Sequence, residues 1–405
     1  IGSFFAIICL PGLKQALTDG SAPLLSRFSE DRQEAGFQVA LRRLENRVEE
    51  LAAFPRFVRP IYKGILYHGI REGSGRVIVG RSGTLLYRDD LEYVAGPGIL
   101  SAAFRERIRA ANDRREDAFE DFMASLWSRA TGKARAVKHE GPVYAEPAEA
   151  VLDLHRQLRE RGVELLVAVI PNKSMLYPEW ATSTYPDSGG PPLHPHFLRW
   201  KEMLAKEGVR VLDMAGPLWE GKSGPGEPFY RALDTHWSPT GVARCADLIA
   251  EAARSVLGPD TPTKFPTRLE SIPELAELVV HLEQPGGVEA WPRQRIEVVQ
   301  VLHGSDPAVI GDAAPVLLLG DSYTMSYVPK VEKGHGGGIA AQLMQRLGRG
   351  VQTVARAGAT PRAMLQILRD RPEALARKRL VILAFVDRSL GNPLGWERVP
   401  LPPKR

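Results

Sequence analysis

Cysteine and long apolar runs are both scarce in this chain, and each shortage excludes a class of protein. Cys9 and Cys245 are the two cysteines among 405 residues, so a disulfide framework and a cysteine-ligated zinc site are excluded. The apolar stretch IGSFFAIICLPGL at residues 1–13 is shorter than the roughly 20 residues that a membrane-spanning helix needs, and no other segment could span a bilayer. We interpret it as a truncated N-terminal anchor or signal, with a buried helix as the alternative.

The sequence also lacks a large excess of charge of one sign, internal repeats and a phosphate-binding loop. The net charge of +5 is the small difference between 53 basic and 48 acidic residues, which alternate in stretches such as FRERIRAANDRREDAFEDF. This pattern is typical of a solvated helix face, and we expect no nucleic-acid partner. The stretch GKSGPGEP at 221–228 lacks the residue order of a phosphate-binding loop and does not follow a strand. We find no internal repeat and no low-complexity tract.

What is present is the composition of a globular protein, with 44% hydrophobic and 25% charged residues. Residues 1–74 are predicted to form a helical, membrane-proximal lead-in, in which apolar spacing indicates a helix until Pro55. RVIVGRSGTLLYRDD then predicts two strands joined by a hairpin-like turn. A long helix follows, whose apolar stripe we expect to face the core: Phe104, Ile108, Ala111, Phe119, Phe122 and Leu126.

After Pro147 helices alternate with apolar strands, which predicts an α/β fold with a five-stranded parallel sheet flanked by helices. We expect the main domain to span 75–395, with an insertion at about 258–314 and a tail at 396–405. The predicted strands are 163–170, 209–214, 316–320, 351–355 and 380–386, and the predicted helices are 147–161, 195–207, 239–257, 338–347 and 361–369.

Ligands of open parallel sheets bind beyond the carboxyl ends of the strands. Asn172 and Lys173 follow one predicted strand, Asp321 and Ser322 follow another, and Gly358 follows a third. A serine, an amide, a cation and a glycine are therefore expected at one edge of the sheet.

A serine nucleophile needs a base, and the stretch FYRALDTHWSPTGVARCADLIA offers one. Ser238 and Pro239 are typical of a helix start, so Asp234 and His236 are predicted on the loop just before it. A neutral imidazole can remove the serine proton, while a carboxylate fixes its tautomer and stabilises the imidazolium. The alternatives are structural: Gly-Asp-Ser forms ordinary turns, and a loop histidine can simply pack on Trp237. Gly-Asp-Ser and the Asp234–His236 loop are both predicted near the ligand-binding edge of the sheet, and together they favour a catalytic role over these structural alternatives.

These residues resemble a family, the SGNH-hydrolase-like alginate O-acetyltransferases of bacterial exopolysaccharide systems. Gly-Asp-Ser at 320–322 resembles the first block of SGNH enzymes, and Asp-Thr-His-Trp at 234–237 resembles the Asp-x-His-Trp motif of the acetyltransferase branch. The order, with the histidine motif first, is the permuted order of the alginate acetylation proteins. VIVGRSGTLLYRDD and VIPNKSMLYPEW are also similar to segments of that family. The resemblance implies an SGNH-hydrolase-like, flavodoxin-like fold in a single-domain member.

By this resemblance, Ser322 is the nucleophile, His236 the base and Asp234 its orienting acid. The backbone N–H groups of Gly358 and Ser322 would hold the oxyanion, and Asn172 is a weak match for a third donor. We further expect three residues to line the same cleft: Lys173, Tyr323 and Arg388. Each has a structural alternative, namely a surface charge, a packing ring and an ion-pair partner. We expect the isolated histidines to be exposed and outside the site: His194, His196 and His335.

The implied reaction is ping-pong transfer of an acetyl group through acyl-Ser322 to a polysaccharide hydroxyl, without a cofactor or metal. The resemblance also implies a membrane-bound O-acyltransferase as acetyl donor, other export components as partners, and a periplasmic location with an inner-membrane anchor. Two alternatives stay open: a polysaccharide acetyl esterase with the same triad, and a non-catalytic polysaccharide-binding scaffold of an export complex.

Overall fold

The computed structural model describes residues 67, 72–113, 144–186, 189–258, 263–273, 276–282, 291, 295–304, 306–307, 314–327 and 337–402. The chain divides into two compact units, residues 1–79 with 278–292 and residues 80–277 with 293–405. Apart from Tyr67, the predicted lead-in helix and the stretch at 1–13 lie outside the described residues, as does the second half of the helix predicted from 104 to 126. Among the residues described, no helix is both long and apolar enough to cross a membrane.

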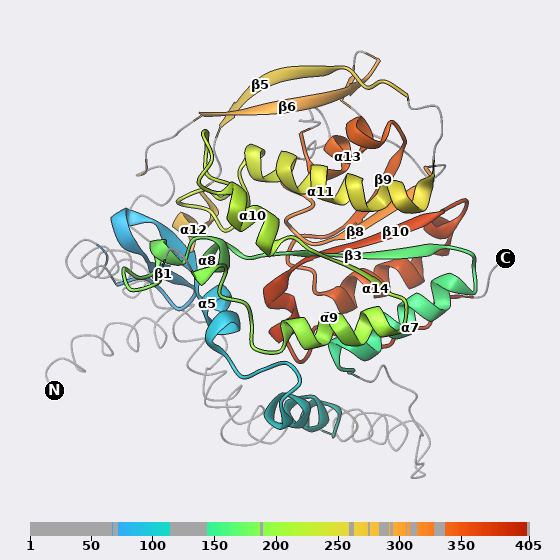
Figure 1. Cartoon of the computed structure of the whole chain (residues 1–405), viewed down its shortest axis with the longest axis horizontal. Coiled ribbons are helices and arrows are strands. Elements are labelled where there is room, and N and C mark those ends of the chain that lie inside the picture. The colour runs from blue at the N-terminus through green and yellow to red at the C-terminus, as the bar shows by residue number, and fades with distance from the viewer. Residues whose placement is uncertain are drawn as a thin grey trace, which may run out of the picture. The chain divides into compact units, whose positions relative to one another are not determined.

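The second unit is built on a five-stranded parallel sheet, in the order β4-β3-β10-β8-β9 (Figure 1). All five predicted strands are confirmed: β3 (Glu164–Ile170), β4 (Arg210–Asp213), β8 (Val316–Gly320), β9 (Val351–Ala355) and β10 (Leu380–Val386). Counted from β8 as the first strand, the spatial order becomes 2-1-3-4-5, which is the flavodoxin-like order. The α/β fold class is therefore confirmed, with the chain entering the sheet at a permuted point.

Helices cover both faces of this sheet, because its strands alternate apolar side chains toward each face. Leu165 and Val167 belong to one core cluster with α7 (Pro147–Arg159), α9 (Phe197–Lys206) and α14 (Pro361–Asp370). Leu166 and Ala168 belong to the other, with α11 (Pro239–Leu257) and α13 (Ile339–Leu347). In Figure 1, α7, α9 and α14 lie on one side of the sheet and α11 and α13 on the other.

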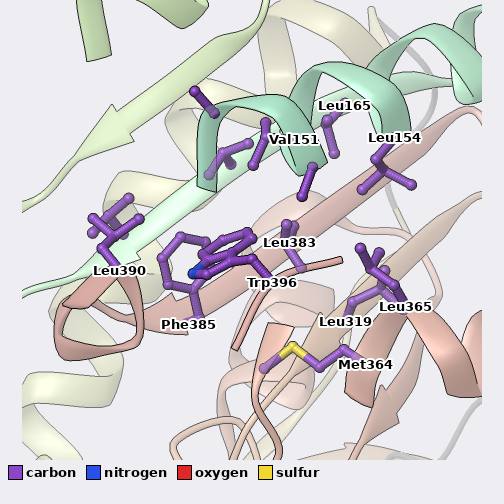
Figure 2. Close-up of a cluster of buried hydrophobic side chains, with 14 of the residues drawn as sticks. Val151, Leu154, Leu165, Leu319, Met364, Leu365, Leu383, Phe385, Leu390 and Trp396 are labelled. Atoms are coloured by element: carbon purple, nitrogen blue, oxygen red, sulfur yellow. The ribbon is translucent and has the colours of Figure 1, made fainter. Parts of the chain in front are cut away.

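The segment after β10, which we expected to be a tail, belongs to the core. Trp396 is fully buried, meets Phe385 edge-on at 5.2 Å and donates from Nε1 to the Ser389 carbonyl at 2.8 Å. Figure 2 shows this pair among side chains from α7, β3, β8 and α14. Val399 and Leu401 are also buried. The large apolar surface of the indole explains the difference, because its burial outweighs the polar residues around it.

The inserted segment between β4 and β8 does not join the main sheet. Its strands pair antiparallel, and they are β5 (Thr267–Pro273), β6 (Arg295–His303) and β7 (Asp306–Pro307), with the short helix α12 (Glu277–Val280) between the first two. Both strand runs predicted near residue 80 are present, as β1 (Val77–Val79) and β2 (Leu85–Tyr87). The remaining helical elements are α5 (Arg88–Ala95), residues 102–113, α8 (Lys173–Leu176) and α10 (Ala215–Gly221), with 3-10 turns at Arg81–Gly83, Pro178–Trp180, Pro372–Leu375 and Asp387–Gly391.

Candidate active site

The turn after β8 carries Gly320, Asp321 and Ser322 at the point where the strand order reverses. A Cβ on Gly320 would meet the Thr324 side chain at 2.1 Å, so the turn requires glycine there. The Asp321 carboxylate accepts from the Tyr323 N–H at 2.9 Å and from the Val386 N–H at 3.0 Å, which joins the ends of β8 and β10. These contacts present Ser322, which is half-buried, at the switch point of the sheet, where such folds bind ligands.

The loop before α11 holds Asp234 and His236 together, as the sequence predicted. Asp234 Oδ1 accepts from the backbone N–H of His236 at 2.9 Å and lies 2.8 Å from His236 Nδ1. Ser238 caps α11 by accepting from the Gly241 N–H at 3.2 Å. Since Nδ1 must carry the proton that bonds Asp234, Nε2 is the nitrogen free to act as a base.

Tyr323 connects the serine turn to the histidine loop. Its buried ring lies 5.0 Å from the His236 ring and meets Trp237 edge-on at 5.5 Å, and its hydroxyl donates to the Thr235 carbonyl at 2.8 Å. Tyr327 adds a hydrogen bond to the Trp237 carbonyl at 3.0 Å. The residue next to Ser322 thus packs directly against His236.

Several polar groups at this junction have no partner. In the part of the chain that the structure describes, His236 Nε2 is buried without a hydrogen bond. Within the same residues, no hydrogen bond is formed by the Ser322 hydroxyl or by the backbone N–H groups of Ser322 and Gly358. Buried polar groups are normally paired, so the unpaired Nε2 of His236 is available to a reacting group.

A cavity of about 770 Å³ opens beside Ser322. Gly358 lines it, in a left-handed conformation (φ 68°) that suits glycine, and so do Arg388 and Thr360. Residues of α5 and of the segment after it also line the cavity. This volume is typical of sites for small molecules or a few sugar units.

The environment of His236 favours its protonated form. Burial alone would lower its pKa, but the carboxylates of Asp234 and Glu277 outweigh burial and raise the pKa of His236 to about 9. Burial likewise acts to raise the pKa of Asp234, yet its bonds from His236 and the nearby Arg231 lower that pKa. The pair is therefore a carboxylate and an imidazolium at neutral pH, and a base at Nε2 becomes available as the pH rises.

Glu277, which no sequence pattern singled out, lies close to the same imidazole nitrogen. Its Oε2 is 3.1 Å from His236 Nδ1. Among the described residues, Asp234, His236 and Glu277 are the group of three whose side-chain atoms lie close enough, within 4.8 Å, to hold a metal ion. Nδ1 would then have to give up the proton that bonds Asp234, so we interpret the group as a hydrogen-bonded Asp234–His236 pair with the Glu277 carboxylate as a second nearby charge. No signal short of the tertiary structure connects Glu277 with His236.

Arg388 lies where the sequence predicted, on the cavity that Ser322 also lines. Its Nη1 pairs with the fully buried Asp90 at 2.6 Å and lies 3.4 Å from the Tyr323 hydroxyl. The guanidinium also stacks over the Tyr87 ring at 5.0 Å. Arg388 is thus both an ion-pair partner, its structural alternative, and a cavity residue with a fixed position.

The other predicted site residues have structural contacts. Asn172 is buried, donates to Asp387 Oδ1 at 2.8 Å and caps α8 by accepting from the Met175 N–H at 2.9 Å. Lys173 is buried instead of exposed, and its Nζ donates to the carbonyls of Leu85, Ala232 and Asp234. Neither residue lines the cavity beside Ser322. Tyr323 has no exposed surface, so its structural alternative, a packing ring, describes it.

His194 contradicts the expectation that the isolated histidines are exposed. It is buried, stacks on Tyr93 at 4.6 Å and lines the cavity. Burial lowers its pKa to about 4, so it is neutral at physiological pH. His196 lies nearby and accepts from the Leu100 N–H at 3.1 Å, while His335 lies outside the described residues. Packing between distant segments, which a loop composition cannot show, buries His194.

The fold and the permuted order of the two motifs define an SGNH-hydrolase-like protein. Comparison with protein families agrees: the family described as "SGNH hydrolase-like domain, acetyltransferase AlgX" matches residues 130–386, and the chain belongs to this family.

Among curated proteins, the chain is similar to two named "Probable alginate O-acetylase AlgJ". It is 28% identical to that of Azotobacter vinelandii over 251 residues, covering 59% of this chain and 61% of the relative. It is also 28% identical to that of Pseudomonas aeruginosa over 257 residues, covering 59% and 62%. The chain thus spans about three-fifths of the length of these relatives.

A solved structure supports the fold. The O-acetyltransferase domain of Pseudomonas putida AlgJ superposes with a TM-score of 0.53 at 20% identity, covering 78% of this chain and 92% of that one.

Proposed function

We propose that this chain is an O-acetyltransferase that moves an acetyl group through acyl-Ser322 onto hydroxyls of an alginate-like bacterial exopolysaccharide. The observation that carries the proposal is His236: its Nδ1 bonds Asp234, its Nε2 is unpaired, and its ring packs on the residue next to Ser322. Family membership and the names of the relatives support the transferred group and the acceptor.

In the proposed reaction, His236 Nε2 takes the Ser322 proton as Oγ attacks the acetyl carbonyl of a donor ester. The oxyanion accepts hydrogen bonds from the unpaired N–H groups of Ser322 and Gly358. The leaving group takes the proton from His236, and acetyl-Ser322 remains. A sugar hydroxyl then gives its proton to His236 and attacks the carbonyl of acetyl-Ser322; as the bond to Oγ breaks, His236 returns the proton to Oγ, which releases the acetylated sugar and restores the serine.

Arg388 is the predicted substrate-binding residue whose position supports that role. Asp90 holds one edge of its guanidinium, while the side chain borders the cavity with Ser322. For Asn172 as a third oxyanion donor, and for Lys173 and Tyr323 as substrate contacts, the geometry offers structural roles instead. The proposal therefore rests on Ser322, His236 and Arg388, with Asp234 behind the base.

The cellular setting is part of the same proposal. A membrane-bound O-acyltransferase would supply the acetyl group, other export components would be partners, and the protein would act in the periplasm from an inner-membrane anchor. These statements rest on the family resemblance and on the curated relatives, which are named for alginate O-acetylation.

The test uses the purified protein with a chromogenic acetyl ester, with and without mannuronate oligosaccharides. Mass spectrometry follows two products: the peptide that contains Ser322, for a gain of one acetyl group, and the sugar. Acetylated sugar that depends on Ser322 is the expected result. Free acetate alone under every condition would support an acetyl esterase, and oligosaccharide binding without any acetyl-Ser322 would support a binding scaffold.

A further inference from the structure

Two carboxylates, not one, approach Nδ1 of His236. Asp234 Oδ1 lies 2.8 Å and Glu277 Oε2 3.1 Å from Nδ1. We propose that Glu277 is a positioning residue, which holds the imidazole together with Asp234 and shares the stabilisation of the imidazolium formed during acyl transfer. This inference rests on the proposed function, because it assigns His236 the role of base.

Glu277 is fixed at its main chain and accessible at its side chain. Its N–H donates to Asp234 Oδ2 at 3.2 Å, so the start of α12 is bonded to the same carboxylate that orients His236. The Glu277 side chain as a whole is 41% exposed, against 3% for Asp234, while its Oε2, the oxygen nearest Nδ1, is buried and forms no hydrogen bond among the described residues. Asp234 is therefore the rigid partner of His236, and Glu277 is a second charge whose removal leaves the Asp234 bond in place.

The other charged and titratable groups around His236 do not duplicate this contribution. Arg231, on the same loop, lies 3.6 Å from Asp234 Oδ2 and bears the opposite charge. The turn after β8 contributes Asp321, whose carboxylate already accepts two backbone N–H groups, and the Tyr323 ring at 5.0 Å. Among the described residues, Asp234 and Glu277 alone place carboxylate oxygens at hydrogen-bonding distance from Nδ1.

A second carboxylate has two opposite effects on a general base. It favours the imidazolium as the serine proton reaches Nε2, which makes His236 a stronger base. It also raises the pKa of His236, to about 9 together with Asp234, so a smaller fraction of the resting protein has a free base at neutral pH. Removing the Glu277 charge should therefore lower the limiting rate and move the pH dependence toward acid.

The test is Glu277→Gln, which keeps the size of the side chain and removes its charge. The first readout is the titration of His236 by NMR of protein labelled at histidine, in a Ser322→Ala background, with the signal assigned by its loss in His236→Gln. We expect the midpoint to fall by about one pH unit, since an opposite charge at this distance shifts a pKa by one unit or more. Glu277→Asp should restore part of the shift.

The second readout is the pH profile of acetyl-ester turnover with Ser322 intact. Glu277→Gln should move the rising limb to lower pH and reduce the high-pH kcat several-fold, with KM unchanged because Glu277 does not line the cavity. Glu251→Gln, the same change at an exposed position of α11, is the matched control and should leave both readouts as in the wild type.

An unchanged His236 titration in Glu277→Gln would overturn the inference, as would a stoichiometric metal ion whose removal by a chelator moves the His236 signal. These results are independent of the proposed function. Turnover that survives Ser322→Ala would refute the proposed nucleophile, while the NMR titration would still show whether Glu277 acts on His236.

Discussion

Two turns at the carboxyl edge of the same sheet use their polar groups in opposite ways. After β3, Asn172 and Lys173 are fully buried, and their side chains bond the Met175 N–H, a carboxylate and three carbonyls. After β8, the Ser322 hydroxyl has no partner among the described residues and borders a cavity. Ser322 is half-buried, so its hydroxyl is open to a molecule in the cavity, which favours a functional interpretation.

The comparison also separates two kinds of buried charge. Lys173 Nζ has all three hydrogens directed at carbonyl oxygens, of Leu85, Ala232 and Asp234, and burial lowers its pKa to about 7. His236 has one nitrogen bonded and one unpaired. A perturbed pKa is common to both residues, so the shift by itself does not identify a catalytic group; the unpaired nitrogen of His236 is what distinguishes it from Lys173.

The largest expected effect is on turnover at the serine turn. Ser322→Ala or His236→Ala should reduce kcat/KM for a chromogenic acetyl ester by about 10³-fold or more, because either change removes the proton transfer that activates the nucleophile. The double variant should be little worse than either one, since both residues act in one unit. Asp234→Asn should cost less, because a wrongly oriented imidazole still acts part of the time.

Thermal unfolding of the same variants is the control, and the melting temperatures should stay close to that of the wild type. Purified Ser322→Ala with undiminished turnover, or with a melting temperature many degrees lower, would show that the turn after β8 is structural like the turn after β3.

Lys173 should show the reverse pattern, a loss of stability. Lys173→Met removes the Nζ donor from three carbonyls, of which that of Ala232 keeps the Leu85 N–H at 2.8 Å, at a cost of about 2 kcal/mol or more in the free energy of unfolding. Urea denaturation measures this loss. Lys201→Met is the matched control, since Lys201 is partly exposed, pairs with Asp213 at 3.2 Å, and should change stability by less than about 1 kcal/mol. If Lys173→Met and Lys201→Met were equally stable, the turn after β3 would not be the structural turn that the comparison with the turn after β8 describes.

Arg388 combines both kinds of contact, so its variants should affect binding more than chemistry. Arg388→Lys keeps a positive charge for Asp90 but loses the planar guanidinium at the cavity. We expect KM for the acceptor oligosaccharide to rise roughly tenfold, about 1.4 kcal/mol, with a smaller change in kcat. Steady-state kinetics at varied acceptor concentration would check this, and an unchanged KM would assign Arg388 to structure alone.

The smallest expected effect is at Gly358. Its φ of 68° disfavours other residues, but a Cβ there would meet no atom within 4 Å. Gly358→Ala should lower the free energy of unfolding by about 1 kcal/mol while keeping the N–H and changing turnover by no more than a few-fold. Gly320→Ala should destabilise more, because its Cβ would clash with Thr324. If Gly358→Ala abolished turnover without unfolding the protein, Gly358 would contribute to the site by leaving room for the substrate and not by its N–H.

Local patterns were sufficient for the strands, the helix start and the motif residues. The strands β3, β8 and β10 are short, almost wholly apolar runs, and Ser238 with Pro239 marks the start of α11 in sequence as in structure. Asp234 and His236 are two residues apart, so the sequence could place both on one loop as a candidate acid and base, while their 2.8 Å contact was decided by the fold. The turn at 320–322 could likewise be predicted from neighbouring residues.

Long-range packing decided what these patterns could not. The chain alone gave no way to know that Lys173 is buried against carbonyls 59 to 88 residues away, or that His194 stacks on Tyr93. Trp396 was expected in a tail, but it completes the core beside Phe385. In each case a partner distant in sequence determines burial, and periodicity contains no information about such partners.

The sequence by itself determined the α/β class, the permuted order of the motifs and the residues able to form a nucleophile, a base and an acid, because propensity, capping and chemistry are local properties. The tertiary structure decided that Tyr323 joins the serine turn to the histidine loop, that Arg388 reaches the cavity from β10, and that Glu277 arrives from an insertion 41 residues beyond His236. Only the folded sheet brings these segments together, since the strand order, not the chain order, sets which loops meet at its carboxyl edge.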